Sequence, residues 1–251
     1  SAGSGYALTT DSYFCDVFAV HKDVDDQVRA NADAALNLER DATEFVTNHL
    51  LQKLEQDFVS TFFAASVWGT DKTGGTDFTQ FDDVSSTPIE TTRAEITAIA
   101  KKTGYKPNTL VMGAEAWQEG WQDHPDVLDR IKYTQTGSVS EDLVARLLGV
   151  DRILVAWSVK NTGAEGETAS YDFNWGKNML LCYVPPRPGL NVPSAGYTFT
   201  WTGYPGAASN GMRMKRFRME HLAADRVEGE FSYDQKVVAS ELGTFFSGVV
   251  A

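Results

Sequence analysis

The residues best suited to chemistry are four that lie close together in the sequence: Glu115, Glu119, Asp123 and His124. Glu115 and Glu119 are four positions apart, which places them on one face of a helix. Paired carboxylates can act as a general acid and a general base when their surroundings separate their pKa values. On a short helix beside Pro125, however, such a group is more typical of carboxylates in contact with water. The hypothesis of an acidic enzyme rests on these four residues.

Other patterns that signal catalysis or metal binding are absent from the sequence. None of the four histidines, His21, His49, His124 and His221, has a second histidine or a cysteine at a metal-ligand spacing. There is no Gly-x-Ser-x-Gly sequence to carry a serine nucleophile. A lone cysteine such as Cys15 is more typical of a small core residue. We therefore predict no catalytic site, no cofactor and no metal site.

One basic cluster stands out near the C-terminal end. Its members are Arg213, Lys215, Arg216 and Arg218. One interpretation is a docking surface for an acidic partner, either the acidic half of a neighbouring copy or nucleic acid. The other is an exposed strand edge whose charges prevent edge-to-edge aggregation. The sequence favours neither.

An aromatic segment near the start of the sequence needs a partner. Residues 11–20 predict a strand with Tyr13, Val17 and Cys15 on one face, and Phe14 and Phe18 on the other. A strand that is apolar on both faces must be covered on both. Because the residues up to about 38 are mostly polar, this arm cannot form a core alone. We list Tyr13, Phe14, Val17 and Phe18, with the four basic residues, as subunit-interface candidates.

The remaining pattern is a mixture of helices and strands. A long helix is predicted over 37–65, with Asn37 as its N-cap and an apolar stripe that changes side along its length. Residues 69–87 read as a loop, and Thr87-Pro88-Ile89-Glu90 begins a helix that stops at Gly104. A further helix ends at Gly149. The shorter predicted elements are a helix over 114–122 and strands over 109–112, 152–159, 171–175, 178–184 and 197–201. The tail is predicted as a strand followed by a helix or a strand. The order shows no regular βαβ alternation, so the class is α+β.

Composition and charge exclude several classes of protein. The 251 residues are 42% hydrophobic, which is enough for a substantial core. No apolar run is long enough to span a membrane. The formal charge of −12 argues against a large basic surface for nucleic acid. Nearly all of that charge lies in residues 1–125, and two distant cysteines fit a reducing compartment.

Five segments of the chain resemble the major capsid proteins of tailed bacteriophages. They are residues 12–46 (SYFCDVFAVHKDV and onward), 108–137 (NTLVMGAEAWQEGWQDHPDVLDRIKYTQTG), 141–163 (EDLVARLLGVDRILVAWSVKNTG), 178–201 (NMLLCYVPPRPGLNVPSAGYTFTW) and 233–251 (YDQKVVASELGTFFSGVVA). The resemblance covers nearly the whole chain and rests on the order of the segments.

This resemblance implies the Hong Kong 97 type of capsid fold, with a long spine helix. Residues 1–36 would be the end of an N-terminal arm and extended loop, in a family that normally has more chain before this point. Residues 37–87 would form a peripheral domain with the spine helix, 88–204 an axial domain, and 205–251 the return to the peripheral domain.

The function that the resemblance implies is structural and not enzymatic. Copies would assemble into hexamers and pentamers of an icosahedral virion shell around double-stranded DNA, in the cytoplasm of the host bacterium. The implied partners are other copies of the chain and scaffold, portal and decoration proteins. Packaged DNA would be contacted only weakly, and no membrane is implied. An encapsulin-like compartment that holds protein cargo is the alternative within the fold, and the acidic enzyme is the alternative from another class.

Overall fold

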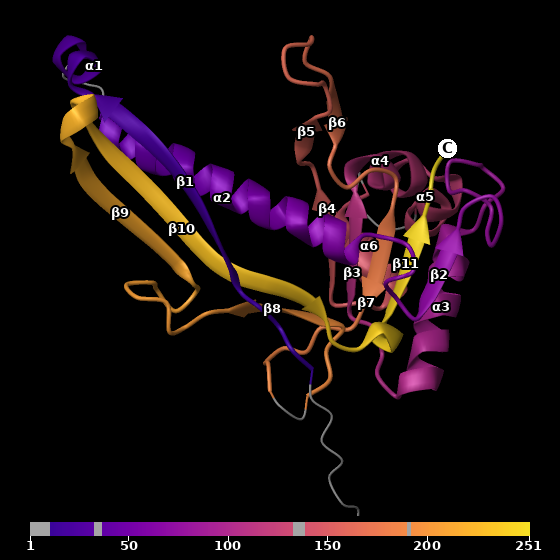
Figure 1. Cartoon of the computed structure of the whole chain (residues 1–251). Coiled ribbons are helices and arrows are strands. Elements are labelled where there is room, and N and C mark those ends of the chain that lie inside the picture. Colours follow the sequence, from indigo (N-terminus) through magenta and orange to yellow (C-terminus); the bar gives the residue numbers. More distant parts are fainter. Residues whose placement is uncertain (1–10, 33–36, 133–138, 190–191) are drawn as a thin grey trace, which may run out of the picture. The chain divides into compact units, whose positions relative to one another are not determined.

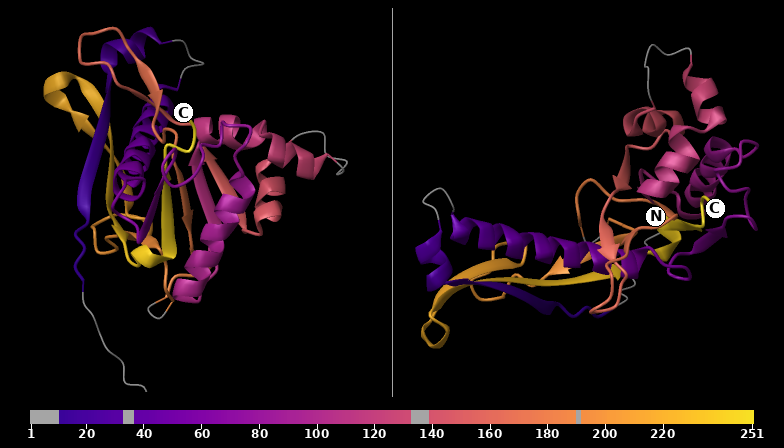
Figure 2. Two further views of the ribbon diagram at one scale, coloured as in Figure 1. Left: turned by 90° about the vertical axis from the view of Figure 1, so that its right-hand side faces the viewer. Right: turned by 90° about the horizontal axis from the view of Figure 1, so that it is seen from above.

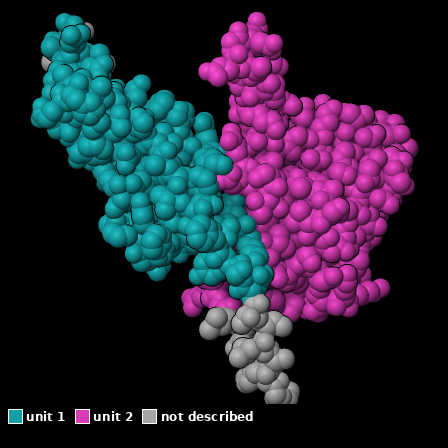
Figure 3. Space-filling view, in the orientation of Figure 1, with its two compact units in different colours: residues 1–55, 198–236 teal, residues 56–197, 237–251 magenta. Residues whose placement is uncertain are grey.

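A computed structural model describes residues 11–32, 37–132, 139–189 and 192–251 of the chain. The chain divides into two compact units, which Figure 3 shows in different colours. Unit 1 comprises residues 1–55 and 198–236, and unit 2 comprises residues 56–197 and 237–251. The long helix begins in unit 1, and its residues from Gln56 onward belong to unit 2.

Unit 1 is a twisted antiparallel sheet with one long helix along it (Figure 1). Strand β10 lies between β1 and β9, and β8 also pairs with β10. The elements are β1 (Asp16–Asp25), α1 (Asp26–Asn31), α2 (Leu38–Phe62), β8 (Gly196–Thr200), β9 (Met212–Met219), a 3-10 turn (Glu220–Leu222) and β10 (Ala224–Val237).

The strand predicted over residues 11–20 lies further along the chain than expected. Strand β1 covers Asp16–Asp25, so it takes in polar residues that the pattern assigned to the arm. The reason is pairing: all ten residues of β1 face partners on β10, from Asp16 opposite Tyr233 to Asp25 opposite Ala224. Residues 16–25 of the arm therefore find a pairing partner within their own chain.

Helix α2 covers one face of this sheet. Val46 and Leu50 on the helix pack with Phe231 and Tyr233 on β10, and all four are buried. The approach is close at Gly229, where a Cβ atom would lie 2.4 Å from Cγ1 of Val46. The Asn37 side chain accepts a hydrogen bond from the backbone N–H of Arg40 at 3.1 Å, which confirms the predicted N-cap.

The two ends of α2 pack against different neighbours, as its changing apolar stripe predicts, with two exceptions along the stripe. Leu38 and Ala42 pack with Val24 and Val227 in unit 1. At the other end of the helix, Phe58 and Phe62 contact a separate cluster in unit 2. The sequence pattern also assigns Phe45 and Leu51 to the stripe, but these side chains are 40% and 47% exposed.

Unit 2 is built on a five-stranded mixed sheet in the order β2-β11-β7-β3-β4. The strands are β2 (Thr70–Thr73), β3 (Thr109–Gly113), β4 (Arg152–Ala156), β7 (Met179–Cys182) and β11 (Gly243–Ser247). Strand β2 lies within the segment predicted as a loop. Its sequence, Thr-Asp-Lys-Thr, carries no strand pattern, and its conformation depends on parallel pairing with β11.

Both faces of the three central strands, β11, β7 and β3, are buried, because neighbouring residues on these strands point into different cores. Phe246 belongs to one core and Phe245 to the other, and Leu110 and Val111 on β3 divide in the same way. Helices cover the first face, and the end of α2 contributes to the second. The helical elements are α3 (Pro88–Thr103), α4 (Ala114–Trp117), a π-helical turn (Gln118–Gln122), α5 (Pro125–Ile131), α6 (Glu141–Leu148) and a 3-10 turn (Ser240–Leu242).

The helix limits in unit 2 confirm the turn residues read from the sequence. Helix α3 begins at Pro88, and Gly104 ends it in the left-handed conformation (φ 78°) with its N–H bonded to the Ala100 carbonyl. Gly149 ends α6 in the same way. The Thr87 side chain makes no capping hydrogen bond. The start of α3 is therefore set by Pro88 and the acidic first turn. The sequence Ser138-Val139-Ser140-Glu141 is a capping-box pattern before α6, and its first residue, Ser138, lies outside the described residues.

A two-stranded hairpin of β5 (Val159–Asn161) and β6 (Tyr171–Phe173) completes unit 2. The predicted strand over 152–159 is therefore divided between β4 and β5. In the part of the chain that the structure describes, no helix combines the length and the apolar character that a bilayer crossing requires.

Candidate subunit interface

The four basic residues predicted from the sequence lie on β9, and each is paired with carboxylates of unit 1. Lys215 and Arg213 contact Glu230, on the face of the sheet away from α2. Arg216 contacts Glu39 and Asp225, and Arg218 bonds Asp26 through both terminal nitrogens (2.7 and 2.5 Å). The charge of the cluster is therefore largely balanced inside the unit.

Glu230 is the centre of the most buried of these networks, being 6% exposed. Its carboxylate accepts hydrogen bonds from Arg213 Nε at 2.6 Å and from the Tyr204 hydroxyl at 2.8 Å, and it also contacts Lys215. Burial alone would raise the pKa of Glu230. The hydrogen bonds from Lys215, Tyr204 and Arg213 outweigh that effect and lower this pKa to about 2.

A second network joins the elements at one end of unit 1. Arg29 on α1 donates to Asp225 at 2.6 Å, and Asp225 also contacts Arg216 and Arg218 on β9. Hydrogen bonding to Arg29 lowers the pKa of Asp225. This network ties α1 and β9 to β10 through charge-assisted bonds, which are stronger than neutral ones.

The four arm residues divide into exposed and covered side chains. Tyr13, Phe14 and Val17 are 56%, 77% and 43% exposed. Tyr13 stacks on Phe199 with ring centroids 4.4 Å apart. Phe18 points to the α2 side, where its ring lies 5.0 Å from that of Tyr233. Tyr13, Phe14 and Val17 thus leave apolar surface open in this chain, and a contact of these eight residues with another copy stays a prediction.

The structure does not bring the four candidate acid–base residues together as a catalytic group. His124 is buried and contacts Ser86 Oγ (3.0 Å) and the Asp83 carbonyl (3.2 Å) through Nε2. Its Nδ1 accepts the backbone N–H of Asp126 at 3.1 Å, which caps helix α5 and assigns the ring proton to Nε2. Glu119 and Asp123 are exposed, and Glu115 is half-buried. The bonds of His124 thus join a loop to a helix start.

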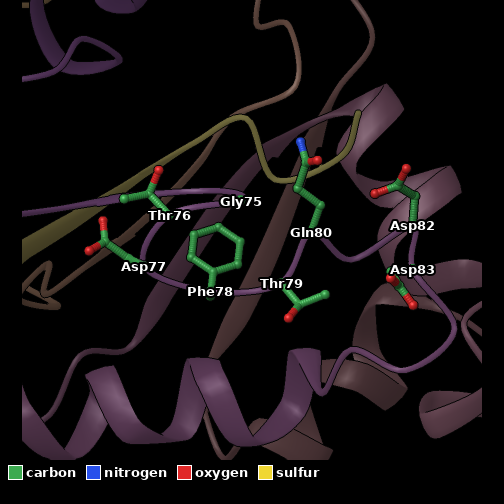
Figure 4. A pocket seen from close by; sticks show the side chains of 8 residues that line it. All are labelled: Gly75, Thr76, Asp77, Phe78, Thr79, Gln80, Asp82 and Asp83. Carbon is green, nitrogen blue, oxygen red and sulfur yellow. The ribbon is translucent and has the colours of Figure 1, made fainter.

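A hollow of about 680 Å³ lies in the loop that follows β2. Figure 4 shows Asp77 at one end of this loop, Asp82 and Asp83 at the other, and Phe78 between them. All three carboxylates are exposed. Within the described residues, no group of three or more His, Cys, Asp or Glu side chains is arranged to hold a metal ion.

The β5–β6 hairpin carries exposed apolar side chains that the sequence pattern alone does not mark as a surface feature. Trp157, Val159 and Tyr171 are 53%, 57% and 70% exposed there. The signal was present in the alternation Trp157-x-Val159 and Tyr171-x-Phe173. This alternation predicts ordinary strands, because an apolar alternation does not indicate whether a core lies beside it.

Comparison with known proteins gives one curated relative that matches part of the chain. The major capsid protein of Burkholderia phage BcepMu is 33% identical over 131 residues, which are 50% of this chain and 41% of that protein. The match thus spans less than half of the relative's length. No protein-family profile matches the chain.

Solved structures share the fold over nearly the whole chain. A phage-related protein from Bordetella bronchiseptica RB50 has a TM-score of 0.77 at 21% identity, covering 97% of this chain and 80% of its own. The capsid structure of Helicobacter pylori bacteriophage KHP30 gives 0.55 at 11% identity, covering 98% and 81%. The SrpI encapsulin of Synechococcus elongatus gives 0.53 at 9% identity, covering 93% and 74%.

The chain therefore has the α+β fold found in phage capsid and encapsulin shells, as its sequence resemblance implies. The resemblance to phage major capsid proteins is likewise confirmed by the curated relative.

Proposed function

We propose that this chain is the shell-forming subunit of a tailed-bacteriophage capsid. Copies assemble into the hexamers and pentamers of an icosahedral virion shell around double-stranded DNA, in the cytoplasm of the host bacterium. The role is structural and not enzymatic. The observation that carries this proposal is the 33% identity to a phage major capsid protein in a chain that has the fold of solved capsids.

We assign unit 1 to the peripheral domain and unit 2 to the axial domain of such a subunit. The bounds differ from those that the resemblance implies, because residues 56–87 and 237–251 lie in unit 2. Unit 1 contains residues 37–55 of the long helix and the returning strands up to residue 236, which supports this assignment. Residues 88–197, most of the predicted axial domain, lie in unit 2. Residues 1–36 act as the end of the arm and loop. Scaffold, portal and decoration proteins are further partners that we propose from the resemblance alone.

The charge of the subunit suits a container for DNA. A net charge of −12 prevents tight phosphate binding, whose affinity comes from neutralisation by lysine and arginine. The bases on β9 are already paired with carboxylates, which leaves them little free charge for phosphate. We therefore expect packaged DNA to be contacted weakly.

An encapsulin-like compartment is the second candidate, because the SrpI encapsulin matches this fold about as well as the KHP30 capsid does. The contents of the particle distinguish the two. Particles purified from the native source, treated with nuclease and imaged by negative-stain electron microscopy, are expected to be closed shells with protected double-stranded DNA.

Shells filled with protein and free of DNA would support the encapsulin instead. A chain that stays monomeric or dimeric at every concentration would contradict both shell proposals. Glu119→Ala and Asp123→Ala variants test the enzyme hypothesis, because loss of an activity without loss of particles would support it.

A further inference from the structure

The β5–β6 hairpin is an element that the rest of unit 2 does not cover. It forms a sheet of only two strands, and Figures 1 and 2 show it projecting from the body of the unit. An isolated two-stranded hairpin is marginally stable in water. A surface that packs against this hairpin would therefore increase its stability.

One face of the hairpin is apolar. Val159 lies opposite Phe173, and Asn161 lies opposite Tyr171. Trp157 lies on the same face, with its ring 6.4 Å from that of Phe173. Since three of these apolar side chains are more than half exposed, the face resembles an interaction surface more than an ordinary solvated strand pair.

The tip of the hairpin is acidic. Glu165 and Glu167 are exposed in the loop that joins the strands, and Asp172 adds a third carboxylate on β6. Lys160 is the only base among the hairpin residues 157–175. A surface that covers this hairpin must therefore be basic and must offer apolar area.

Unit 2 has such a surface where α3 and α6 end. Lys101 and Lys102 lie in the last turn of α3, and Arg146 lies in that of α6. Lys106 donates to the Gly149 carbonyl at 2.5 Å, which brings the two helix ends together, and Tyr105 beside it is 40% exposed. The nearby carboxylates are Glu241, which pairs with Lys102, and Asp151, which contacts Asn108.

These two surfaces lie at opposite ends of unit 2. In Figure 1 the hairpin extends upward, and the C-terminal end of α3 lies at the bottom of the unit. The hairpin of one copy therefore cannot reach the basic helix ends of the same unit. Complementary charge on opposite ends fits a head-to-tail contact between copies, and such contacts close into rings when the rotation allows it.

We propose that the β5–β6 hairpin of one copy docks on the basic helix ends of a second copy, with Glu165 and Glu167 facing Lys101 and Arg146. The apolar face packs beside Tyr105. This inference rests on the proposed shell function, because it names the contact that joins neighbouring subunits.

Charge reversal tests the contact in the full-length protein. The double variants Glu165→Lys/Glu167→Lys and Lys101→Glu/Arg146→Glu each place like charges together, and we expect each to lower the yield of assembled particles about tenfold. The quadruple variant restores opposite charges and is expected to recover assembly. The matched control is Glu119→Lys/Asp123→Lys, which makes the same change at exposed carboxylates elsewhere on unit 2 and should leave assembly unchanged.

Mixing the two double variants provides a second test of the contact. An equimolar mixture of the two double variants can assemble only if hairpins and helix ends alternate between copies, so we expect even-membered rings that neither variant forms alone. Sedimentation velocity measures this. Unchanged assembly of both double variants would overturn the inference. So would a quadruple variant that has the circular dichroism spectrum of the wild type, and is therefore folded, but does not recover assembly.

Hydrogen exchange separates this inference from the proposed function. In wild-type shells, the amides of residues 157–175 should exchange more slowly than in dissociated subunits. If shells form and these amides exchange equally fast in both states, the docking is wrong and the shell function stands. If the wild type forms no shells, the proposed function itself fails.

Discussion

At the scale of single residues, the candidate functional side chains make bonds that stabilise the fold. His124 caps a helix and joins a loop to it, and the basic residues of β9 are paired with carboxylates of their own unit. The sequence could predict that these residues are polar and clustered. It could not predict their partners, because Glu230 and Glu39 come from distant positions that only the sheet register and the helix bring close.

The Glu230 network makes stability depend on pH. Because the pKa of Glu230 is about 2 in the folded chain and near 4.5 ordinarily, its stabilising effect is complete above pH 4.5 and is lost as the pH falls toward 2. Glu230→Gln should lower the free energy of unfolding at neutral pH by about 2 kcal/mol. Urea unfolding at several pH values measures both effects.

Glu228→Gln is the matched control for that variant. Glu228 contacts Lys215 at 3.4 Å and is more exposed than Glu230, so its loss should cost about 0.5 kcal/mol. Equal effects of the two substitutions at neutral pH would contradict the central position of Glu230.

His124→Ala should destabilise unit 2. The change removes the cap of α5 and the buried bond to Ser86, at a cost of about 2 kcal/mol. Asp123→Ala, at the exposed neighbouring position, should stay within about 0.5 kcal/mol of the wild type. Thermal unfolding measures the difference. A stable His124→Ala chain that loses an enzymatic activity would reverse this interpretation.

At the scale of elements, the sequence predicts those with strong local signals. Helices α2 and α3 were predicted within a few residues, because Asn37, Pro88 and Gly104 mark their ends. The sequence does not predict strand β2 or the first part of β10, because the residues there are mostly polar. In β10 one face carries Glu228 and Glu230, whose charges are balanced by a neighbouring strand that a local pattern does not reveal.

The packing of α2 on the sheet depends on Gly229. A Cβ there would lie 2.4 Å from Val46 and 2.9 Å from Leu50. Gly229→Ala must therefore push the helix away from β10, and we expect a loss of about 1–3 kcal/mol in the free energy of unfolding. Denaturant titration monitored by circular dichroism measures it.

Ala19→Val is the control on the same sheet. Ala19 is exposed on β1, on the face away from α2, so added methyl groups meet no helix there. A change within about 0.5 kcal/mol is expected. If the two variants unfold alike, the close approach of α2 is not a constraint on stability.

At the scale of the whole molecule, the chain leaves apolar surface open in both units. Tyr13 and Phe14 are exposed in unit 1, and Trp157 and Tyr171 are exposed in unit 2. Monomeric proteins seldom leave several such sites uncovered. In a shell of many copies, each exposed site can be buried by a neighbour, which accounts for the arm and the hairpin together.

The most direct test of the shell account is cryo-electron microscopy of particles assembled from the full-length protein. The account predicts closed shells in which copies of this fold cluster around fivefold and sixfold positions. A protein that remains a monomer or a closed dimer under all assembly conditions, with Trp157 and Phe14 in contact with water, would contradict it.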